Sequence, residues 1–154
     1  MLNSTLSLLS LEAKAYAKPV SGEITVGFSL ETPVYSSTLK DWRIHDGIDI
    51  AADLGTNVVA VNDGVVEKIV SDDLFGITVT IKHTDGKKSI YSNLADSVEL
   101  EEGQIINRSD IIGTVGNTAI YEISDGPHLH FEMTENGEKI DPTGVIKFTE
   151  KNSD

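Results

Sequence analysis

The stretch GPHLHFE, Gly126–Glu132, holds two of the four histidines in this chain of 154 residues. The run from Leu129 to Met133 is typical of a β-strand, and the rigid Gly-Pro pair before it favours a sharp entry into that strand. Side chains two residues apart on a strand point to the same face, about 6.5 Å apart along it. The spacing therefore predicts that His128 and His130 face one site, where one binds a metal and the other acts beside it.

A second stretch, WRIHDGIDI at Trp42–Ile50, offers the other half of such a site. His45 and Asp49 are separated by three residues, and a fully extended chain would place them about 13 Å apart, too far for two short side chains to share one ion. Gly47 lies between them and allows a bend, because glycine tolerates backbone angles that other residues avoid. Two histidine nitrogens and one aspartate oxygen would form a zinc site with a fourth position open to water, which is the catalytic arrangement.

Each stretch alone is a weak signal, but the two together resemble a known family. The words DGIDIA and GPHLHFE resemble the signature of the LytM/lysostaphin-type zinc endopeptidases, which cut peptide cross-links in bacterial peptidoglycan. The resemblance covers roughly residues 19–145 and implies that His45, Asp49 and His130 bind Zn²⁺. It also implies that His128 is a catalytic residue, which orients and helps to deprotonate the attacking water.

The chain departs from this family at one catalytic position. A second catalytic histidine normally lies in a Tyr-x-His-Leu segment, which here reads Tyr91-Ser92-Asn93-Leu94. An amide cannot pass a proton, although Asn93 can still donate a hydrogen bond. Loss of a positioned acid–base group typically costs about 100- to 10,000-fold in rate. We therefore expect a degenerate site with little peptidase activity; the alternative is an active zinc peptidoglycan endopeptidase with His128 as its sole general base.

The remaining histidine, His83, precedes the turn Thr84–Lys87, whose Asp-Gly pair is predicted to join strands at 77–81 and 89–91. A structural role near this loop is the favoured interpretation. The alternative, that His83 replaces the missing catalytic histidine, would require a different placement of the hairpin.

Length and apolar content predict one domain built from β-strands. The chain has 39% hydrophobic residues, and short β-rich runs recur between Gly, Asn and Asp turns. The predicted strands are Glu23–Ser29, Asn57–Val61, Val65–Val70, Gly76–Lys82, Lys88–Asn93, Ile111–Val115 and Leu129–Thr134. Asn62-Asp63-Gly64 is interpreted as a hairpin turn, and Glu101–Gln104 as another turn. This pattern predicts an all-β fold, an antiparallel β-sandwich or partly open barrel.

The ends of the chain and its charge complete this description. Residues 1–18 are predicted to form a short helix and linker, residues 19–146 the zinc-binding domain, and residues 147–154 a polar tail. The net charge of −13 argues against nucleic acid and against adsorption to anionic membranes. The absence of cysteine fits an exported bacterial protein. The chain has no signal peptide and no apolar run long enough to span a membrane. Because it begins abruptly, we expect it to be a soluble piece of a membrane-anchored protein.

A narrower resemblance lies within the family. The words Tyr35–Arg43 and Gly116–Pro127 resemble those of stage II sporulation protein Q and its clostridial and bacillar relatives. Within them, Trp42 is interpreted as a packed aromatic residue and Arg43 as its salt-bridged neighbour. Proteins of this group are anchored in the forespore membrane and place a LytM domain in the space between two membranes. There the domain binds a mother-cell protein, stage III sporulation protein AH, which implies a similar protein partner here, with peptidoglycan as a further ligand.

Three functions follow as hypotheses. The first is a binding module of a sporulation channel, whose zinc is structural or regulatory. The second is the active endopeptidase, and the third is a β-sandwich adaptor without metal. Asn93 separates the first from the second, and the complete His45, Asp49 and His130 set separates both from the third.

Overall fold

A computed structural model describes residues 15–119 and 126–148 of the chain, almost all of whose regular structure is β-strand. The strands are β1 (Ile24–Val26), β2 (Ser29–Ser36), β3 (Asp41–His45), β4 (Ile48–Ala51), β5 (Asn57–Val59), β6 (Gly64–Asp72), β7 (Gly76–Lys82), β8 (Lys87–Leu94), β9 (Ile105–Ile106), β10 (Ile111–Thr114), β11 (His128–Glu135) and β12 (Glu138–Ile140). One 3-10 turn, Pro142–Gly144, follows β12. The predicted N-terminal helix falls mainly on residues 1–14, and most of the predicted C-terminal tail on residues 149–154; both ranges lie outside the described residues.

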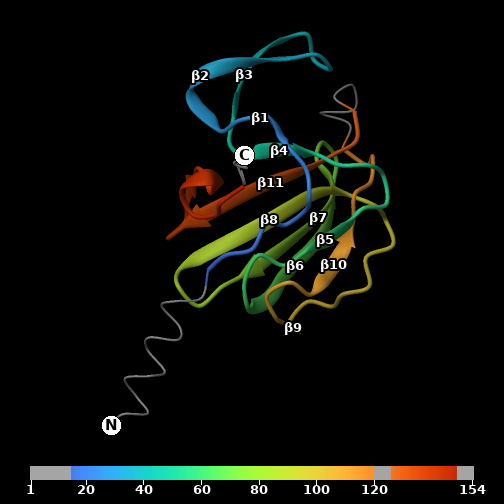
Figure 1. Cartoon of the computed structure of the whole chain (residues 1–154). Helices are drawn as coiled ribbons and strands as arrows, with labels where there is room; N and C mark the ends of the chain where they lie inside the picture. Colours follow the sequence, from blue (N-terminus) through green and yellow to red (C-terminus); the bar gives the residue numbers. More distant parts are fainter. Residues whose placement is uncertain (1–14, 120–125, 149–154) are drawn as a thin grey trace, which may run out of the picture.

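The main sheet has eight strands in the order β1-β4-β11-β8-β7-β6-β9, with β12 added to β11 (Figure 1). Two smaller sheets, β10–β5 and β2–β3, complete the fold. Every strand pair in the described residues is antiparallel. The predicted all-β, antiparallel fold class is therefore confirmed.

Strand β11 is central to this sheet and is buried on both faces. Its odd-numbered residues before Glu135 are apolar and enter the core: Leu129, Phe131 and Met133 are completely buried. Its even-numbered residues are polar and point to the opposite face. Burial of each large apolar side chain contributes about 1.5–3 kcal/mol, so the apolar face fixes the register of β11. The polar residues are placed as a consequence.

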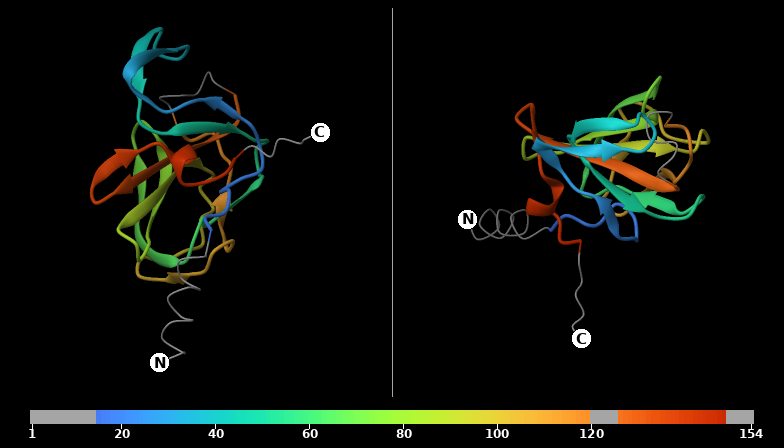
Figure 2. Two further views of the ribbon diagram at one scale, coloured as in Figure 1. Left: turned by 60° about the vertical axis from the view of Figure 1, so that its left-hand side comes forward. Right: turned by 90° about the horizontal axis from the view of Figure 1, so that it is seen from above.

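The hairpin of β2 and β3 stands away from the main sheet, as Figure 1 and the left view of Figure 2 show. Neither strand was predicted across Ser29–His45. Trp42 is 67% exposed, so its interpretation as a packed aromatic residue is wrong, although its ring contacts that of Tyr35 edge-on at 5.5 Å. The expected ion pair of Arg43 is present, since its Nε lies 2.9 Å from the Oδ1 of Asp41.

The predicted turns differ in outcome. Asp85-Gly86 does join β7 to β8, and Gly86 has a positive φ of 84° that favours glycine. Glu101–Gln104 is also a turn, closed by a backbone hydrogen bond from Gln104 to Glu101. The Asn62-Asp63-Gly64 hairpin is wrong, because β5 pairs with β10 while β6 pairs with β7 and β9. The segment instead carries the chain from the small sheet to the main sheet.

His83 belongs to a buried hydrogen-bonded chain on the side of the fold near the β7–β8 turn. Its Nδ1 lies 2.8 Å from the carbonyl oxygen of Asp63, and its Nε2 lies 2.8 Å from the Oγ of Ser89. The Oγ of Ser89 also lies 2.7 Å from the hydroxyl oxygen of Tyr91. That oxygen accepts a hydrogen bond from the backbone N–H of Val61. A neutral ring with its proton on Nδ1 satisfies every member. The favoured structural role of His83 agrees with these contacts.

This network predicts a dependence of stability on pH. Burial lowers the pKa of His83 below its ordinary value, despite the opposing carboxylates of Asp63 and Asp85. On acidification the unfolded chain therefore takes up the proton first, and stability falls as the pH drops below about 6.5. We expect His83→Asn to lose about 1–3 kcal/mol at pH 7, because it leaves buried partners unsatisfied.

Urea unfolding of the metal-free protein at pH 7 and pH 5 tests this prediction. The loss of stability between the two pH values should be smaller in His83→Asn than in the parent protein. The other three histidines are the same in both proteins and so contribute equally. An equal loss in both proteins would contradict a neutral, buried His83.

Candidate metal centre

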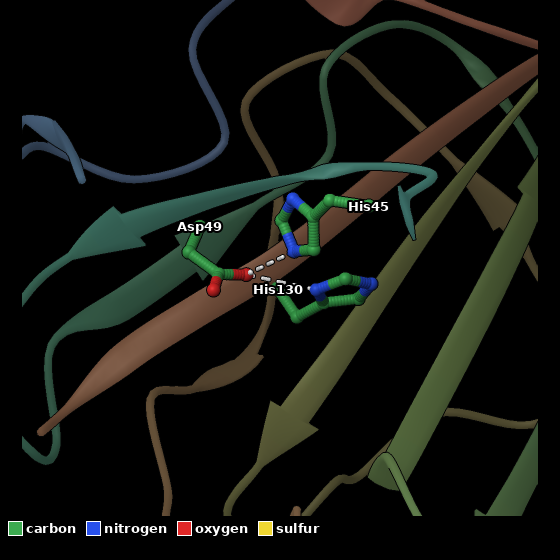
Figure 3. A group of neighbouring side chains, drawn as sticks. All are labelled: His45, Asp49 and His130. Atoms are coloured by element: carbon green, nitrogen blue, oxygen red, sulfur yellow. Dashed lines mark hydrogen bonds and ion pairs between the residues drawn. The ribbon is translucent and has the colours of Figure 1, made fainter. Parts of the chain in front are cut away.

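The register between β4 and β11 brings Asp49 and His130 together. The two residues are direct partners across the strands, and Ile50 and Phe131 beside them are buried in the core. Residues opposite each other in an antiparallel pair share a face, so the carboxylate and the imidazole meet on the other side of the sheet. The Nδ1 of His130 lies 2.8 Å from the Oδ1 of Asp49, and both residues are buried (Figure 3).

His45 reaches the same carboxylate from the end of β3. Its Nε2 lies 3.3 Å from the Oδ1 of Asp49 (Figure 3), and its Nδ1 lies 3.0 Å from the carbonyl oxygen of Gly27. An Nδ1–H donated to that carbonyl fixes the tautomer in which the Nε2 lone pair faces Asp49. The predicted bend between His45 and Asp49 is confirmed, since β3 ends at His45 and β4 begins at Ile48, one residue before Asp49.

The role of Gly47 in this bend differs from the one expected. Gly47 is not among the residues with positive φ, so special backbone angles do not explain it. A Cβ at this position would lie 2.5 Å from the carbonyl oxygen of Phe131, which no side chain can tolerate. Glycine is required because the bend passes directly against β11.

The three predicted ligands fit a divalent metal. The ligand atoms of His45, Asp49 and His130 all lie within 4.8 Å of one another. Two nitrogens and one oxygen at 2.0–2.2 Å from an ion are the ligands that zinc prefers, and tetrahedral ligands at this range lie about 3.3 Å apart. The second carboxylate oxygen of Asp49, Oδ2, is buried without a hydrogen-bond partner. A buried carboxylate that lacks a donor normally needs a positive charge nearby.

His128 lies beside these three residues. Its Nδ1 is 2.7 Å from the carbonyl oxygen of Gly126, and its Nε2 is 3.9 Å from the Oδ2 of Asp49. The two-residue spacing on β11 thus places both imidazoles on one face, as predicted. The distance to Asp49 is longer than that of His45 or His130, which agrees with a position beside the ligand group rather than within it.

Asn93 has a structural environment that the sequence did not indicate. Its backbone has a positive φ of 66°, a conformation that asparagine adopts more readily than most residues. Its Nδ2 donates to the carbonyl oxygen of His128 at 2.8 Å, and its Oδ1 accepts the backbone N–H of Ala119 at 2.9 Å. The residue is only 3% exposed. Both polar groups of the amide are therefore bonded to the backbone.

Glu132 and Lys139 are functional candidates that the sequence reasoning missed. The Oε2 of Glu132 lies 2.8 Å from the Nε2 of His130, and the ammonium of Lys139 contacts the other carboxylate oxygen. Burial would raise the pKa of Glu132, but the hydrogen bond from His130 and the charge of Lys139 outweigh it and lower this pKa to about 2. The sequence contained enough information to predict Glu132, because it is two residues from His130 on a strand and so shares its face.

A family model described as Peptidase family M23 matches residues 43–142, which include every residue of the group in Figure 3. The chain belongs to peptidase family M23. The matched range also includes His128 and Asn93, so both residues lie inside the M23 domain. No helix among residues 15–119 and 126–148 is sufficiently long and apolar to cross a membrane.

Curated relatives of the M23 domain include enzymes and a sporulation protein. The DD-carboxypeptidase/endopeptidase Mpg of Neisseria meningitidis is 35% identical over 130 residues, which cover 77% of this chain and 29% of that protein. Stage II sporulation protein Q of Bacillus subtilis is 31% identical over 107 residues, which cover 68% of this chain and 37% of that protein. The chain therefore spans well under half the length of either relative.

Solved structures with the same fold likewise include a peptidase and a chain of the SpoIIQ–SpoIIIAH complex. A zinc-containing peptidase from Vibrio cholerae has a TM-score of 0.71 and 28% identity, covering 83% of this chain and 39% of that one. The SpoIIQ–SpoIIIAH pore-forming complex contains a chain with a TM-score of 0.74 and 24% identity, covering 86% of this chain and 91% of that one. At that identity the second likeness establishes the fold alone.

Proposed function

We propose that this M23 domain binds one zinc ion, has lost most peptidase activity and acts as a protein-binding module of a sporulating cell. In this proposal His45, Asp49 and His130 hold the metal. A zinc ion there would supply a Lewis acid and a fixed positive charge beside Asp49. The longer protein that contains this domain would be anchored in the forespore membrane, with this domain in the intermembrane space. Its partner would resemble stage III sporulation protein AH, and peptidoglycan would be a further ligand.

The environment of Asn93 is the observation that carries the loss of catalysis. A general acid or base must reach the reacting atoms with a group that can exchange a proton. The amide of Asn93 has no such group, and both its ends are bonded to the backbone at His128 and Ala119. Asn93 therefore holds the start of β11 in place instead of serving the site. The identity to stage II sporulation protein Q of Bacillus subtilis supports the sporulation role.

The second candidate function is an active zinc peptidoglycan endopeptidase. It is favoured by the complete ligand set, by His128 beside Asp49, and by the 35% identity to a carboxypeptidase/endopeptidase. In that case His128 would act alone as general base. The two functions differ in one measurable respect, the cleavage of peptide cross-links by the zinc-loaded protein.

We expect the zinc-loaded domain to release little or no soluble peptide from purified peptidoglycan, at least about 100-fold less than an active M23 enzyme, because one acid–base group is missing. Turbidity of a cell-wall suspension and chromatography of the products measure this. His128→Ala is the matched control, since it removes the last candidate base while sparing the three proposed ligands. Robust digestion that disappears in His128→Ala would establish the endopeptidase and refute the binding module.

Asn93→His is not expected to restore activity. The substitution removes two buried hydrogen bonds and places a bulkier ring at a positive φ. Its main effect should be to lower the free energy of unfolding by about 1–3 kcal/mol, which urea unfolding would measure.

A further inference from the structure

His130 has a carboxylate at each ring nitrogen. Its Nδ1 lies 2.8 Å from the Oδ1 of Asp49, and its Nε2 lies 2.8 Å from the Oε2 of Glu132. Asp46, His130 and Glu132 also form a second group whose ligand atoms lie within 4.8 Å of one another. One imidazole is thus shared between two sets of residues, each with the chemistry to hold a divalent ion.

The second group already contains a positive charge. The ammonium of Lys139 contacts Glu132 and lies 3.5 Å from the Oδ2 of Asp46. Lys139 reaches this position because β12 pairs with β11, where it faces Thr134, and Thr134 shares a face with Glu132 two residues away. A metal ion in the second group would have to displace this ammonium, whereas no lysine or arginine of the described residues forms an ion pair with Asp49.

The same ion pair favours one tautomer of His130. A neutral imidazole has one N–H and one lone pair. The carboxylate of Glu132 only accepts hydrogen bonds when ionised, so it favours the proton on Nε2. The lone pair then lies on Nδ1, which faces Asp49 and His45.

We propose that the Glu132–Lys139 ion pair selects Nδ1 of His130 as the metal-ligating nitrogen, and so decides which of the two groups takes the ion. The inference rests on the proposed metal group of His45, Asp49 and His130. Glu132 and Lys139 act through His130 and are positioning residues. The carboxylate of Glu132 accepts a hydrogen bond from the Nε2–H of His130. The ammonium of Lys139 fixes Glu132 and occupies the place that a metal ion would take in the second group.

The first test is nitrogen-15 NMR of the histidine rings in the zinc-loaded protein. Each ring nitrogen gives a different signal when it carries a proton or binds zinc. We expect His130 to keep its proton on Nε2 and to bind zinc through Nδ1. Coordination through Nε2 would overturn the inference and leave zinc binding itself intact. A protein that takes up no zinc would overturn both this inference and the proposed metal group.

The second test compares variants by competition with a zinc chelator. Glu132→Gln should weaken zinc binding about 10- to 100-fold, as losses of such outer hydrogen-bond partners do, because the glutamine amide can donate to Nε2 and shift the ring proton to Nδ1. Lys139→Met should add a population with zinc on Nε2, since Asp46 and Glu132 then lack their ammonium. Lys88→Met is the matched control, because Lys88 forms a similar ion pair with Glu67 at 3.0 Å elsewhere on the main sheet.

Circular dichroism and thermal melting of each variant separate these effects from unfolding. A purely structural role of Glu132 would lower the melting temperature and leave the ring signals of His130 unchanged. Zinc affinity of Glu132→Gln within twofold of the parent protein, with unchanged ring signals, would overturn the inference. If Glu132→Gln fails to fold, the ring signals of the parent protein and of Lys139→Met decide it.

Discussion

His130→Ala is expected to weaken zinc binding by more than about 100-fold, since even the loss of a partner outside the ligand group costs 10- to 100-fold. The parent protein should bind one zinc per chain. An ion that binds only the folded state stabilises it, by about 2.7 kcal/mol when its concentration is 100 times Kd. His130→Ala should therefore lose both the metal and this increment of stability. Metal analysis and thermal melting with and without zinc measure the two effects.

His128→Ala serves as the control for zinc binding, because His128 lies on the same face of β11 and is equally buried. We expect this variant to retain one zinc and its stabilisation. Less than about a tenth of an equivalent of zinc in the parent protein, after expression with added zinc, would refute the metal site. Retention of full zinc affinity by His130→Ala would refute the ligand assignment.

The second large effect should appear in partner binding. We expect His45→Ala and His130→Ala to weaken the complex with the soluble domain of the proposed sporulation partner by about tenfold or more. His45 ends β3, so the metal would tie the base of the exposed β2–β3 hairpin to β11. Without it a buried carboxylate lacks its charge partner, and ordering the loosened segment costs about 0.5–1.5 kcal/mol for each immobilised side chain.

Binding titrations of the three histidine variants test this expectation. His128→Ala spares the proposed ligands and should bind the partner like the parent protein. A matching loss of affinity on removal of zinc from the parent protein by a chelator would link the effect to the metal rather than to the substitutions. Equal affinity of the zinc-free and zinc-loaded proteins would show that the metal does not support the complex.

Short local motifs carried most of what could be predicted. Alternation along Leu129–Met133 identified β11 and placed its two histidines on one face. Turn chemistry identified the β7–β8 hairpin correctly and failed at Asn62–Gly64, because turn residues specify a bend but not the strands that pair around it. The pairing of β5 with β10 depends on contacts between distant parts of the chain, which no local pattern contains.

The parts of the site that escaped prediction depend on the same distant contacts. Gly47 was correctly identified as the bend, but its reason, the close approach to Phe131, requires the register of β11. Asn93 was expected only to donate a hydrogen bond at the position of the missing histidine, since only its side-chain type is visible in the sequence. The sequence reveals neither its positive φ nor its hydrogen bonds to His128 and Ala119.

The pair His130 and Asp49 joins positions 81 residues apart in a chain that has no cysteine. With the proposed ion in place, this contact would act as a cross-link across that loop. A disulfide closing a loop of this length restricts the unfolded chain by about 4–5 kcal/mol at 25 °C. A metal cross-link differs in what opens it, because reductants leave it intact while chelators and acid release it. The durability of the domain would therefore follow the zinc supply of its compartment and not its redox state.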